Sequence, residues 1–353
     1  MSTIRGKNLT VTVFGESHAE AIGVVVEGLP AGLRVDFQEL QAFMQRRAAG
    51  GAFATARVEA DAPEFVSGLV DGVTCGTPVT AIIRNTNVHS GDYRDLRDHP
   101  RPSHADYPAS VRFDGHNDVR GGGQFSGRLT AALCVAGGLC KQLLKAKGVA
   151  IGGHIASIGA VRDARFDAVS VTEADFVTDS FPVLDLTAKE RMQALILEAK
   201  KDGDSVGGTI ECAAVGLPAG FGDALFDGLE SRISAIMFGI PAVKGLEFGN
   251  GFDTAELRGS ENNDVYYWDG DVVKTRTNRH GGILGGISTG MPLMVRVAIK
   301  PTPSIAKPQE TVELSTKTAY TLTITGRHDP CIVPRAVPCV EAALAIALAD
   351  YLI

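Results

Sequence analysis

The N-terminal part of the chain alternates apolar and polar residues in a way that predicts a β-hairpin. Residues 9–13 follow this alternation, a polar break that contains glycine occupies residues 15–18, and strand character resumes over residues 22–28. Farther along the chain, short apolar runs predict strands at residues 78–83, 206–215 and 293–299.

Apolar residues spaced three and four apart predict four helices, at residues 36–47, 129–144, 187–199 and 340–352. Asp36 and Thr187 each begin a capping-box pattern, and Gly148 and Gly203 are placed to stop their helices. The last helix is almost wholly apolar. We therefore expect it to be buried, with a contact between subunits as one place for it.

The order of these elements favours an α+β fold. Strands and helices are mixed, but a strict alternation of strand and helix is absent, which disfavours a doubly wound sheet and favours separate layers. The chain has no repeat of about 20–50 residues and no long linker rich in serine or proline. Residues 1–353 are therefore expected to form a single domain.

The composition limits the ligands that the protein as a whole would attract. Of the 353 residues, 44% are hydrophobic, which is enough for a sizeable core, and the formal net charge is -7. Such a surface does not favour nucleic acid or an anionic membrane as a partner. An anionic ligand would therefore need a local group of cations.

Other features are typical of a cytoplasmic protein. Residues 1–7 lack the apolar stretch of a signal peptide, and no window reaches the roughly 18 apolar residues of a membrane span. The six cysteines are scattered and form no CxxC pair, so neither a zinc site nor a disulfide framework is expected.

Two common nucleotide-binding motifs are absent. No GxxxxGK followed by serine or threonine occurs, so the chain has no P-loop. A Rossmann fingerprint fails because the sixth position counted from Gly121 is Ser126 rather than glycine. A flavin or dinucleotide would have to bind by another architecture.

Two glycine-flanked polar clusters in the first half of the chain could carry chemistry. In residues 14–18, His18 lies at a turn, where it could carry a proton or simply be held by backbone groups. The second cluster runs from His104 to Arg128, immediately before a strong helix. Backbone N–H groups there, with Ser126 and Arg128, would form an anion cradle. The alternative is a glycine-rich helix entry with a solvated arginine.

The third cluster combines residues 300–304 with residues 326–330 and Arg335. Its cations, hydroxyls and carboxylate lie on proline-stiffened loops, where they could hold a phosphate while Asp329 handles a proton. The alternative is a surface pair between Arg327 and Asp329, an arrangement that stabilises a protein by only about 0–1 kcal/mol.

Taken in order from about Gly6 to the C-terminus, these and other motifs resemble the chorismate synthase family. The segments that carry the resemblance are Gly15-Glu16-Ser17-His18, Val26-Glu27-Gly28-Leu29-Pro30, Arg101-Pro102-Ser103-His104-Ala105-Asp106-Tyr107, residues 121–128, residues 202–208, residues 242–245, residues 258–260, residues 282–288, Arg327-His328-Asp329-Pro330 and Arg335-Ala336-Val337-Pro338.

The resemblance implies a β-α-β sandwich of helices between antiparallel sheets, assembled as a homotetramer. It also implies the family's reaction in the shikimate pathway to aromatic amino acids. In that reaction, 5-enolpyruvylshikimate 3-phosphate loses phosphate and a ring hydrogen by 1,4-anti elimination to give chorismate. Reduced FMN is required, although there is no net redox change. Because the substrate carries a phosphate and two carboxylates, its site must be strongly cationic.

The resemblance also implies which residues form the site. The implied catalytic residues are His18, His104, Asp329, Ser17 and Ser126. Of these, the two histidines would act as acids towards the flavin and the departing phosphate, and Asp329 would assist proton removal. The residues implied to hold FMN are Gln124, Phe125, Ser126, Pro241, Ala242, Gly285, Lys300, Pro301, Thr302, Pro303, Ser304 and Arg327. Those implied to bind substrate or NADPH are Arg46, Arg128 and Arg335.

The chain departs from the family pattern at three places. Ala19 follows His18 where glycine is usual, and Phe125 replaces a small hydroxyl residue, which favours a stacking contact. In the loop Ala48–Ala56, Ala52 occupies the position of a cation that could pair with a phosphate. We therefore expect little NADPH-driven reduction of the flavin by this chain.

Two other functions remain open from the sequence. One is a flavin-binding reductase without the elimination chemistry, and the other is a non-catalytic module that binds phosphate or flavin. The presence of His18, His104 and Asp329 argues against the first, because reduction alone does not need this acid and base set. The loss of a loop cation at Ala52 is the only support for the second.

Overall fold

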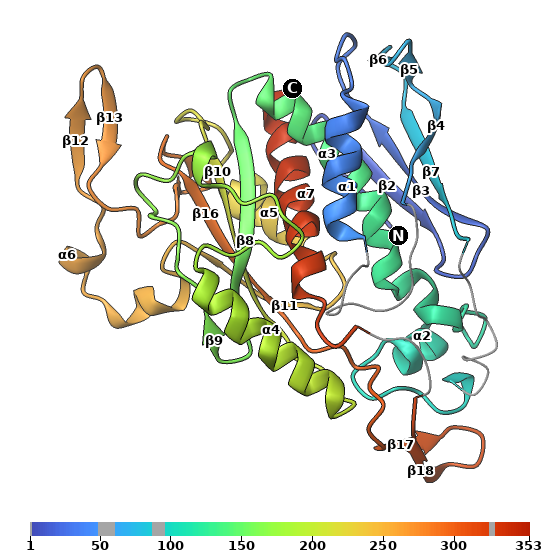
Figure 1. Cartoon of the computed structure of the whole chain (residues 1–353). Helices are drawn as coiled ribbons and strands as arrows, with labels where there is room; N and C mark the ends of the chain where they lie inside the picture. Colours follow the sequence, from blue (N-terminus) through green and yellow to red (C-terminus); the bar gives the residue numbers. More distant parts are fainter. Residues whose placement is uncertain (1, 49–60, 87–95, 325–328) are drawn as a thin grey trace.

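Two five-stranded antiparallel sheets enclose a layer of helices (Figure 1). The computed structural model describes residues 2–48, 61–86, 96–324 and 329–353. In the first sheet the strands are, in spatial order, β1 (Thr3–Arg5), β2 (Thr10–Gly15), β3 (Ala21–Glu27), β7 (Val79–Arg84) and β4 (Glu64–Ser67). In the second sheet they are β11 (Val243–Phe248), β16 (Leu293–Ile299), β10 (Gly208–Val215), β8 (Ala150–Ile158) and β9 (Val161–Arg162). The predicted α+β sandwich is confirmed.

The helices and the smaller elements complete the described part of the chain. The α-helices are α1 (Phe37–Arg47), α2 (Asp106–Arg112), α3 (Thr130–Lys145), α4 (Leu186–Lys201), α5 (Leu229–Met237), α6 (Gly259–Asn262) and α7 (Val333–Leu352). The 3-10 helices are η2 (Arg120–Phe125), η3 (Gly127–Leu129), η4 (Glu173–Asp175), η5 (Leu225–Asp227) and η6 (Gly251–Glu256). The short ribbons pair β5 (Leu69–Val70) with β6 (Val73–Thr74), β12 (Tyr266–Asp269) with β13 (Val272–Thr275), β14 (Ile283–Leu284) with β15 (Ile287–Ser288), and β17 (Gln309–Glu313) with β18 (Thr318–Leu322).

The predicted N-terminal hairpin forms from β2 and β3. Val11 lies opposite Val26, and Val13 lies opposite Val24. Because side chains alternate between the two faces of a strand, this register turns Val11, Val24 and Val26 together into the core, where each is at most 3% exposed. The break between the two strands carries Ser17 and His18.

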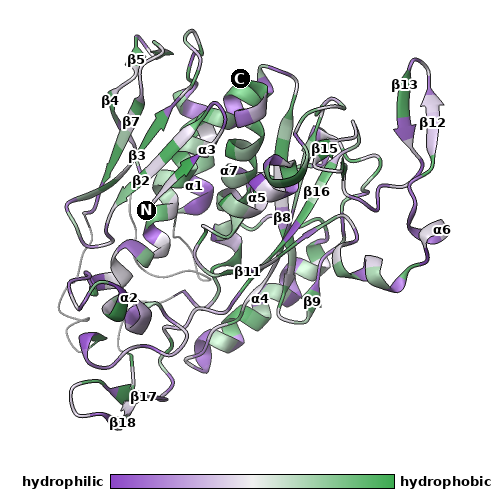
Figure 2. Ribbon diagram, turned by 180° about the vertical axis from the view of Figure 1, so that it is seen from behind, coloured by the Kyte–Doolittle hydropathy of each residue, from purple (hydrophilic) through white to green (hydrophobic). Residues whose placement is uncertain are grey.

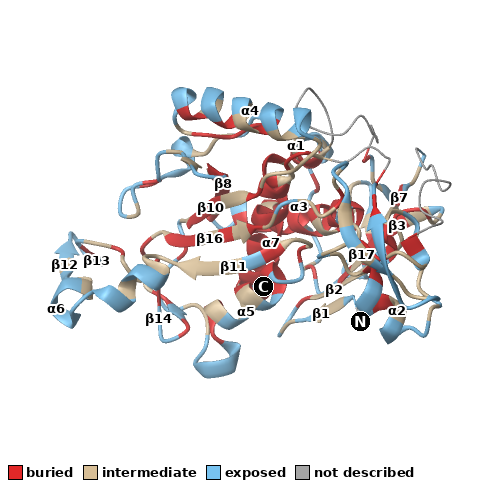
Figure 3. Cartoon of the chain, turned by 90° about the horizontal axis from the view of Figure 1, so that it is seen from below, coloured by how far each residue is buried: buried red, intermediate tan, exposed pale blue. Residues whose placement is uncertain are grey.

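The two central helices connect the sheets. Helix α3 contacts β2, β3 and β7, helix α7 contacts β8 and β10, and the two helices contact each other. Their backbones approach closely because a Cβ at Gly137 would overlap the Cα of Ala342. Figure 2 shows that α7 is hydrophobic along most of its length, and Figure 3 shows it buried at the centre of the molecule. The apolar last helix is therefore buried within one chain.

Two helix starts differ from the sequence-based prediction. Asp185, not Thr187, caps α4, since its carboxylate accepts the Thr187 N–H at 2.8 Å. Helix α7 begins at Val333, seven residues before the predicted start at Val340. Pro334 is tolerated in the first turn of the helix, and Pro338 lies inside it at the cost of one backbone hydrogen bond.

Strand β8 was not predicted, although it lies in the interior of the second sheet. Gly152 and Gly153 weaken its apolar pattern, but both are needed where they stand. A side chain at Gly152 would overlap the Phe176 ring, and a Cβ at Gly153 would lie only 3.1 Å from the Glu211 carbonyl oxygen of the neighbouring strand. Among the described helices, none is both long and apolar enough to cross a membrane.

Candidate active site

A cleft of about 670 Å³ opens where the loops at one end of the sandwich meet the start of α7. Segments far apart in the sequence form its wall: the β2–β3 turn, the end of α1, the loop before α2, the glycine turn before α3, the α5–β11 turn and the segment after β16. Most of the predicted site residues line it, namely Ser17, His104, Gln124, Phe125, Ser126, Arg128, Pro241, Ala242, Lys300, Thr302, Pro303, Ser304, Asp329 and Arg335.

The cleft concentrates positive charge in an acidic chain. Among the described residues, six cationic side chains line it, against the two carboxylates of Asp61 and Asp329. The cations are Arg47, Arg101, Arg128, Lys244, Lys300 and Arg335. With a net charge of -7 for the whole chain, this local excess is the cation group that an anionic ligand requires.

A left-handed glycine turn brings the first two polar clusters together. Gly121, Gly122 and Gly123 have φ angles of 58°, 85° and 54°, a run of conformations that residues with a Cβ rarely adopt. A side chain at Gly121 would overlap the imidazole of His18, so the turn passes directly over this ring. The N–H of the neighbouring Ser17 donates to the Gly123 carbonyl at 3.2 Å. His18 thus lies against the cleft wall at Gly121.

His104 is held by a carboxylate and an arginine. Its Nδ1 lies 2.6 Å from Asp106 Oδ1, and Arg101 donates to both Asp106 oxygens at 2.7 Å. Arg101 also donates to the Ser304 hydroxyl at 3.0 Å, which ties the loop before α2 to the segment after β16. Since Asp106 accepts at Nδ1, the proton of the neutral His104 ring is on that nitrogen, and Nε2, which lies near Gly122, carries none.

The charges around His104 set its protonation. Burial lowers its pKa, and the cations of Arg101 and Lys300 lower it further, while the bond to Asp106 opposes them. The pKa of Asp106 falls despite burial because Arg101 and His104 both donate to it. His104 is therefore neutral at neutral pH, and Asp106 is ionised.

A second ionic group in the cleft wall consists of Asp61, Arg47 and Arg128. Buried Asp61 accepts from both Arg47 and Arg128, and Arg128 also donates from Nε to Asn85 at 3.0 Å. Burial raises the pKa of Asp61, but the two guanidiniums outweigh it and hold the pKa below its usual value. Both arginines are thereby fixed in direction at the cleft wall.

Asp329 lies in the cleft wall and not on an open surface. Arg335 donates from Nη1 to its carboxylate at 2.5 Å and from Nε to the Arg47 carbonyl at 2.9 Å. The alternative of a surface pair between Arg327 and Asp329 is not tested by the described residues, which show the contact of Asp329 with Arg335. Arg327 itself lies outside the described residues, as does Ala52.

Another part of the cleft wall carries two lysines, Lys244 and Lys300, and two residues with a strained backbone, Ser103 and Ala242. Lys300 donates to the carbonyl of Ser103. The pKa of Lys300 is lowered, mainly by burial and to a lesser extent by the charge of Lys244. Ser103 and Ala242 have φ angles of 59° and 74° although neither is glycine. Such conformations cost free energy and cluster at functional sites. Phe125 is 39% exposed in the cleft and lies 6.4 Å from the Phe113 ring, which leaves its own ring open to a stacking partner.

Some predicted residues do not reach the cleft lining of this chain. Arg46 is turned away and donates twice to Glu341, at 3.0 and 2.7 Å. Gly285 lies in the turn between β14 and β15, on the α5 side of the second sheet. Pro301 lies within the segment after β16 but is not among the lining residues. These placements give no support to contacts of Arg46 or Gly285 with a ligand in this cleft.

Other cleft residues were not predicted as site residues. Arg47 and Asp61 are two of them, and Arg101 and Lys244 are two more. The Arg101-x-x-His104-x-Asp106 spacing is the one signal that could have been used, because it places all three in a single turn. Asp61 left no local signal, since its partners are 14 and 67 residues away in the sequence.

Comparison with known proteins agrees with this arrangement. A model of the chorismate synthase family matches residues 9–353. The chorismate synthase of Thermococcus gammatolerans is 47% identical over 350 residues, which cover 99% of this chain and 97% of the relative. That of Dehalococcoides mccartyi is 45% identical over 351 residues, with coverages of 99% and 96%. A crystal structure of a chorismate synthase matches with a TM-score of 0.76 at 28% identity and covers 99% of this chain and 92% of the other. The chain therefore belongs to the chorismate synthase family of carbon–oxygen lyases acting on phosphates.

Proposed function

We propose that the cleft performs the elimination of phosphate from 5-enolpyruvylshikimate 3-phosphate, with reduced FMN bound beside the substrate. The observation that carries this proposal is the set of six cations around His104 in a chain of net charge -7. The substrate has three anionic groups that must leave water to react. Fixed cations replace that water without rearranging during the reaction.

His104 is the proposed acid for the departing phosphate. Without an anion beside it, its imidazole is neutral, because burial and the nearby cations lower its pKa. A phosphate beside Nε2 would add negative charge there and raise that pKa, so the ring would gain a proton together with the substrate. Asp106 holds the opposite nitrogen at 2.6 Å and keeps the proton on Nε2 directed at the leaving oxygen.

His18, Ser17, Ser126 and Asp329 are the other proposed catalytic groups. His18 lies under the glycine turn, where it would serve as the acid for the flavin side of the cleft. Ser126 accepts the Arg128 N–H at 3.3 Å, so its hydroxyl proton remains available to a ligand. Asp329 would receive a proton, and Arg335 holds its carboxylate in place by a hydrogen bond.

The cleft suits a flavin mononucleotide in size and chemistry. Its volume of about 670 Å³ lies within the range of roughly 300–1,000 Å³ for ligand and cofactor sites. Burial and then the charge of Lys244 lower the pKa of Lys300, an effect that a bound phosphate would oppose, and Phe125 offers an exposed ring. Reduced FMN, when bound, would supply the electron-rich ring that the elimination requires. Arg128 and Arg335 are the proposed substrate-binding cations.

A single anaerobic experiment tests this proposal. The purified chain is mixed with the substrate and photoreduced FMN, and phosphate release is followed together with the absorbance of chorismate. We expect both to appear in equal amounts, and neither with oxidised FMN. Protein that is folded and binds flavin but releases no phosphate would contradict the proposal. That outcome would favour a reductase or a non-catalytic binding module.

We also propose that this chain depends on reduced flavin from another source. The proposal rests on the sequence of the loop Ala48–Ala56, in which Ala52 offers no cation to a dinucleotide. Anaerobic incubation with NADPH, oxidised FMN and substrate is expected to give no appreciable turnover. Turnover under these conditions would overturn the proposal without affecting the elimination chemistry.

The proposed assembly is a homotetramer of single-domain chains in the cytoplasm. Its support is the apolar surface on segments that project from the sandwich, where Phe226, Phe252 and Trp268 are 91%, 80% and 70% exposed. The hairpin of β12 and β13 extends well away from the body (Figure 1). Free thiols at all six cysteines suit a reducing compartment. Sedimentation equilibrium should give four times 37.1 kDa, and a monomer would contradict the assembly.

A further inference from the structure

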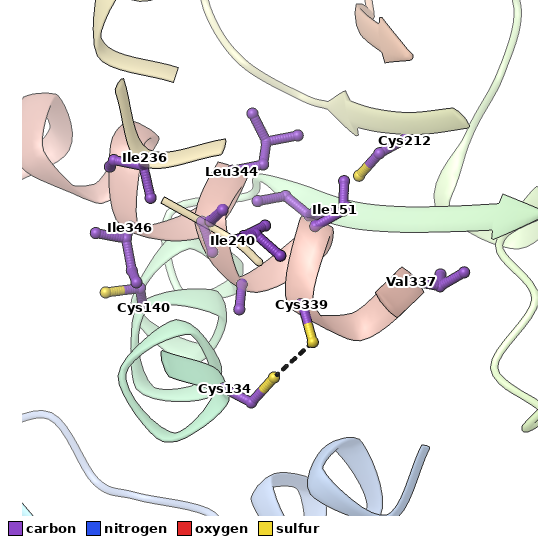
Figure 4. Packing of buried hydrophobic residues seen from close by; sticks show 14 of the residues in the cluster. Cys134, Cys140, Ile151, Cys212, Ile236, Ile240, Val337, Cys339, Leu344 and Ile346 are labelled. Carbon is purple, nitrogen blue, oxygen red and sulfur yellow. Dashed lines mark hydrogen bonds between the residues drawn. The ribbon is translucent and has the colours of Figure 1, made fainter. Parts of the chain in front are cut away.

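Two cysteines from different helices meet beneath the cleft. The sulfur of Cys134 on α3 lies 3.9 Å from the sulfur of Cys339 on α7 (Figure 4). Cys339 is one of the cleft-lining residues, and Cys134 lies behind it with no exposed surface. A small solute in the cleft would therefore reach Cys339 first and Cys134 only through it.

The packing of the two helices keeps these cysteines close. Three residues farther along both helices, Gly137 meets Ala342 so closely that no Cβ fits between the backbones. A disulfide spans Cα separations of about 4.4–6.8 Å, and we infer that helices packed this closely one turn away can provide one. Pro338 precedes Cys339 and removes one backbone hydrogen bond of α7, so the turn that carries Cys339 can adjust as the sulfurs approach.

The surroundings favour the thiolate at Cys339 and the thiol at Cys134. Cys134 donates to the Cys339 sulfur, and the guanidiniums of Arg47 and Arg335 face that sulfur with the Thr130 hydroxyl. These groups lower the pKa of Cys339, whereas burial raises the pKa of Cys134. The thiolate is the nucleophilic form of cysteine, so the pair has one reactive sulfur and one that can resolve it.

We propose that Cys339 is a site of oxidation by hydrogen peroxide, and that Cys134 resolves it into a disulfide between α3 and α7. The Cys339 thiolate attacks one peroxide oxygen, the O–O bond breaks, and hydroxide leaves and takes up a proton as water. The Cys134 thiol then attacks the resulting sulfenic sulfur, and its proton leaves with the sulfenic oxygen as a second water. Two thiols and one peroxide thus give one disulfide and two waters, with two electrons passing from sulfur to oxygen.

The pair connects the oxidation state of the protein to its cleft. Arg335, which holds Asp329, is one helical turn before Cys339, and its backbone carbonyl oxygen lies 3.4 Å from the Cys339 sulfur, which donates to it only in the protonated form. A disulfide would draw Cys339 towards α3 and away from this carbonyl. Reduced flavins form peroxide with oxygen, so this part of the inference rests on the proposed function. The oxidation chemistry itself needs only peroxide.

The test uses the full chain without flavin or substrate, so that its failure is separate from a failure of the proposed function. One equivalent of hydrogen peroxide is added to the reduced protein, remaining thiols are alkylated, and the products are counted and mapped by mass spectrometry. We expect two of the six thiols to be lost, a peptide pair linked through Cys134 and Cys339, and recovery of both thiols with dithiothreitol.

Matched variants assign the two roles. Cys134→Ser should lose one thiol and leave a sulfenic acid at Cys339 that a 1,3-diketone traps, with Cys134→Ala made in parallel in case the serine does not fold. Cys339→Ser should leave Cys134 unoxidised. Cys140→Ser is the control and should form the disulfide normally, because burial raises the pKa of Cys140 to about 12 and keeps it out of the chemistry.

Two results would overturn the inference. In one, the wild-type chain forms no link between Cys134 and Cys339 under conditions that oxidise the exposed Cys75, whose pKa is lowered by Thr77. In the other, Cys134 is oxidised in the Cys339→Ser variant as fast as in the wild type. Either would show that the sulfur facing the cleft is not the reactive one.

Discussion

Arg46 and Arg47 are neighbours in the sequence, yet they belong to two different ionic groups. Arg46 binds Glu341 in the interior with Lys141, whose Nζ lies 2.5 Å from the same carboxylate. Arg47 binds Asp61 together with Arg128 at the cleft. Consecutive residues on a helix point about 100° apart, so one faces the closed interior and the other faces the cleft. The same ionic chemistry thus surrounds a fully buried carboxylate in the first group and lines the cleft in the second.

The largest effect is expected at a cleft residue that touches the reacting atoms. His104→Asn should lower turnover with photoreduced FMN by about 10²–10⁴-fold, because the proposed mechanism then lacks its proton donor to the phosphate. Its amide can still donate to Asp106, so the urea midpoint should change little. The matched variant His154→Gln alters a fully buried histidine of the second sheet, and its folded fraction should keep turnover. Equal loss of turnover in both variants would contradict the distinction between cleft residues and residues buried elsewhere in the fold.

Substitutions in the group of Arg46, Lys141 and Glu341 should change the stability of the protein strongly, without a direct effect on turnover. Glu341 is fully buried, and the cations of Lys141 and Arg46 lower its pKa against the effect of burial. Glu341→Gln leaves two cations with too little compensation and should cost about 3–5 kcal/mol in the free energy of unfolding. Inorganic phosphate should not restore this loss, since the side chain of Glu341 has no exposed surface through which an anion could take its place. Recovery with phosphate in urea denaturation would show that the group is open.

The group at the cleft should be rescued by an anion. Asp61→Asn removes the counter-charge of Arg47 and Arg128, and should cost about 1–3 kcal/mol because water in the cleft replaces part of the lost interaction. Inorganic phosphate can take the place of the carboxylate there. We expect it to raise the melting temperature of Asp61→Asn more than that of the wild type. An equal shift in both would count against an open anion site beside Asp61.

The smallest effects are expected in the pH dependence of stability, with opposite signs for two histidines. His154 donates to Asp163 and Glu211, each at 3.0 Å, and these bonds raise its pKa although burial opposes them. A raised pKa gives stability that is fully present below the ordinary histidine value and is lost as pH rises through the raised value. The lowered pKa of His104 has the opposite consequence, a loss of stability as pH falls below the ordinary value towards the lowered one.

Urea midpoints between about pH 5 and pH 9 would separate the two contributions. His154→Gln should abolish part of the decline on the alkaline side, and His104→Asn should abolish part of the decline on the acid side. If His154→Gln kept the full alkaline decline, the charged state assigned to His154 would be wrong. The two variants act as controls for each other, because each leaves the other histidine in place.

Local patterns predicted a large share of the fold and of the site. The alternation in β2 and β3 and the apolar spacing in α3 were sufficient because strand and helix periodicity depends on near neighbours. The predicted cap at Thr187 was wrong because Asp185 offers a better-placed carboxylate to the same turn. Strand β8 was missed since its glycines make room for Phe176, a requirement that no local pattern expresses.

The sequence by itself determined the layers, the polar clusters and the family to which their order belongs. Only the tertiary structure decided that Arg47 rather than Arg46 faces the cleft, that Asp61 pairs with both cleft arginines, and that Cys134 meets Cys339. The physical reason is distance along the chain. Periodicity and capping act over a few residues, whereas a side chain's partner across the fold depends on how closely helices and sheets pack.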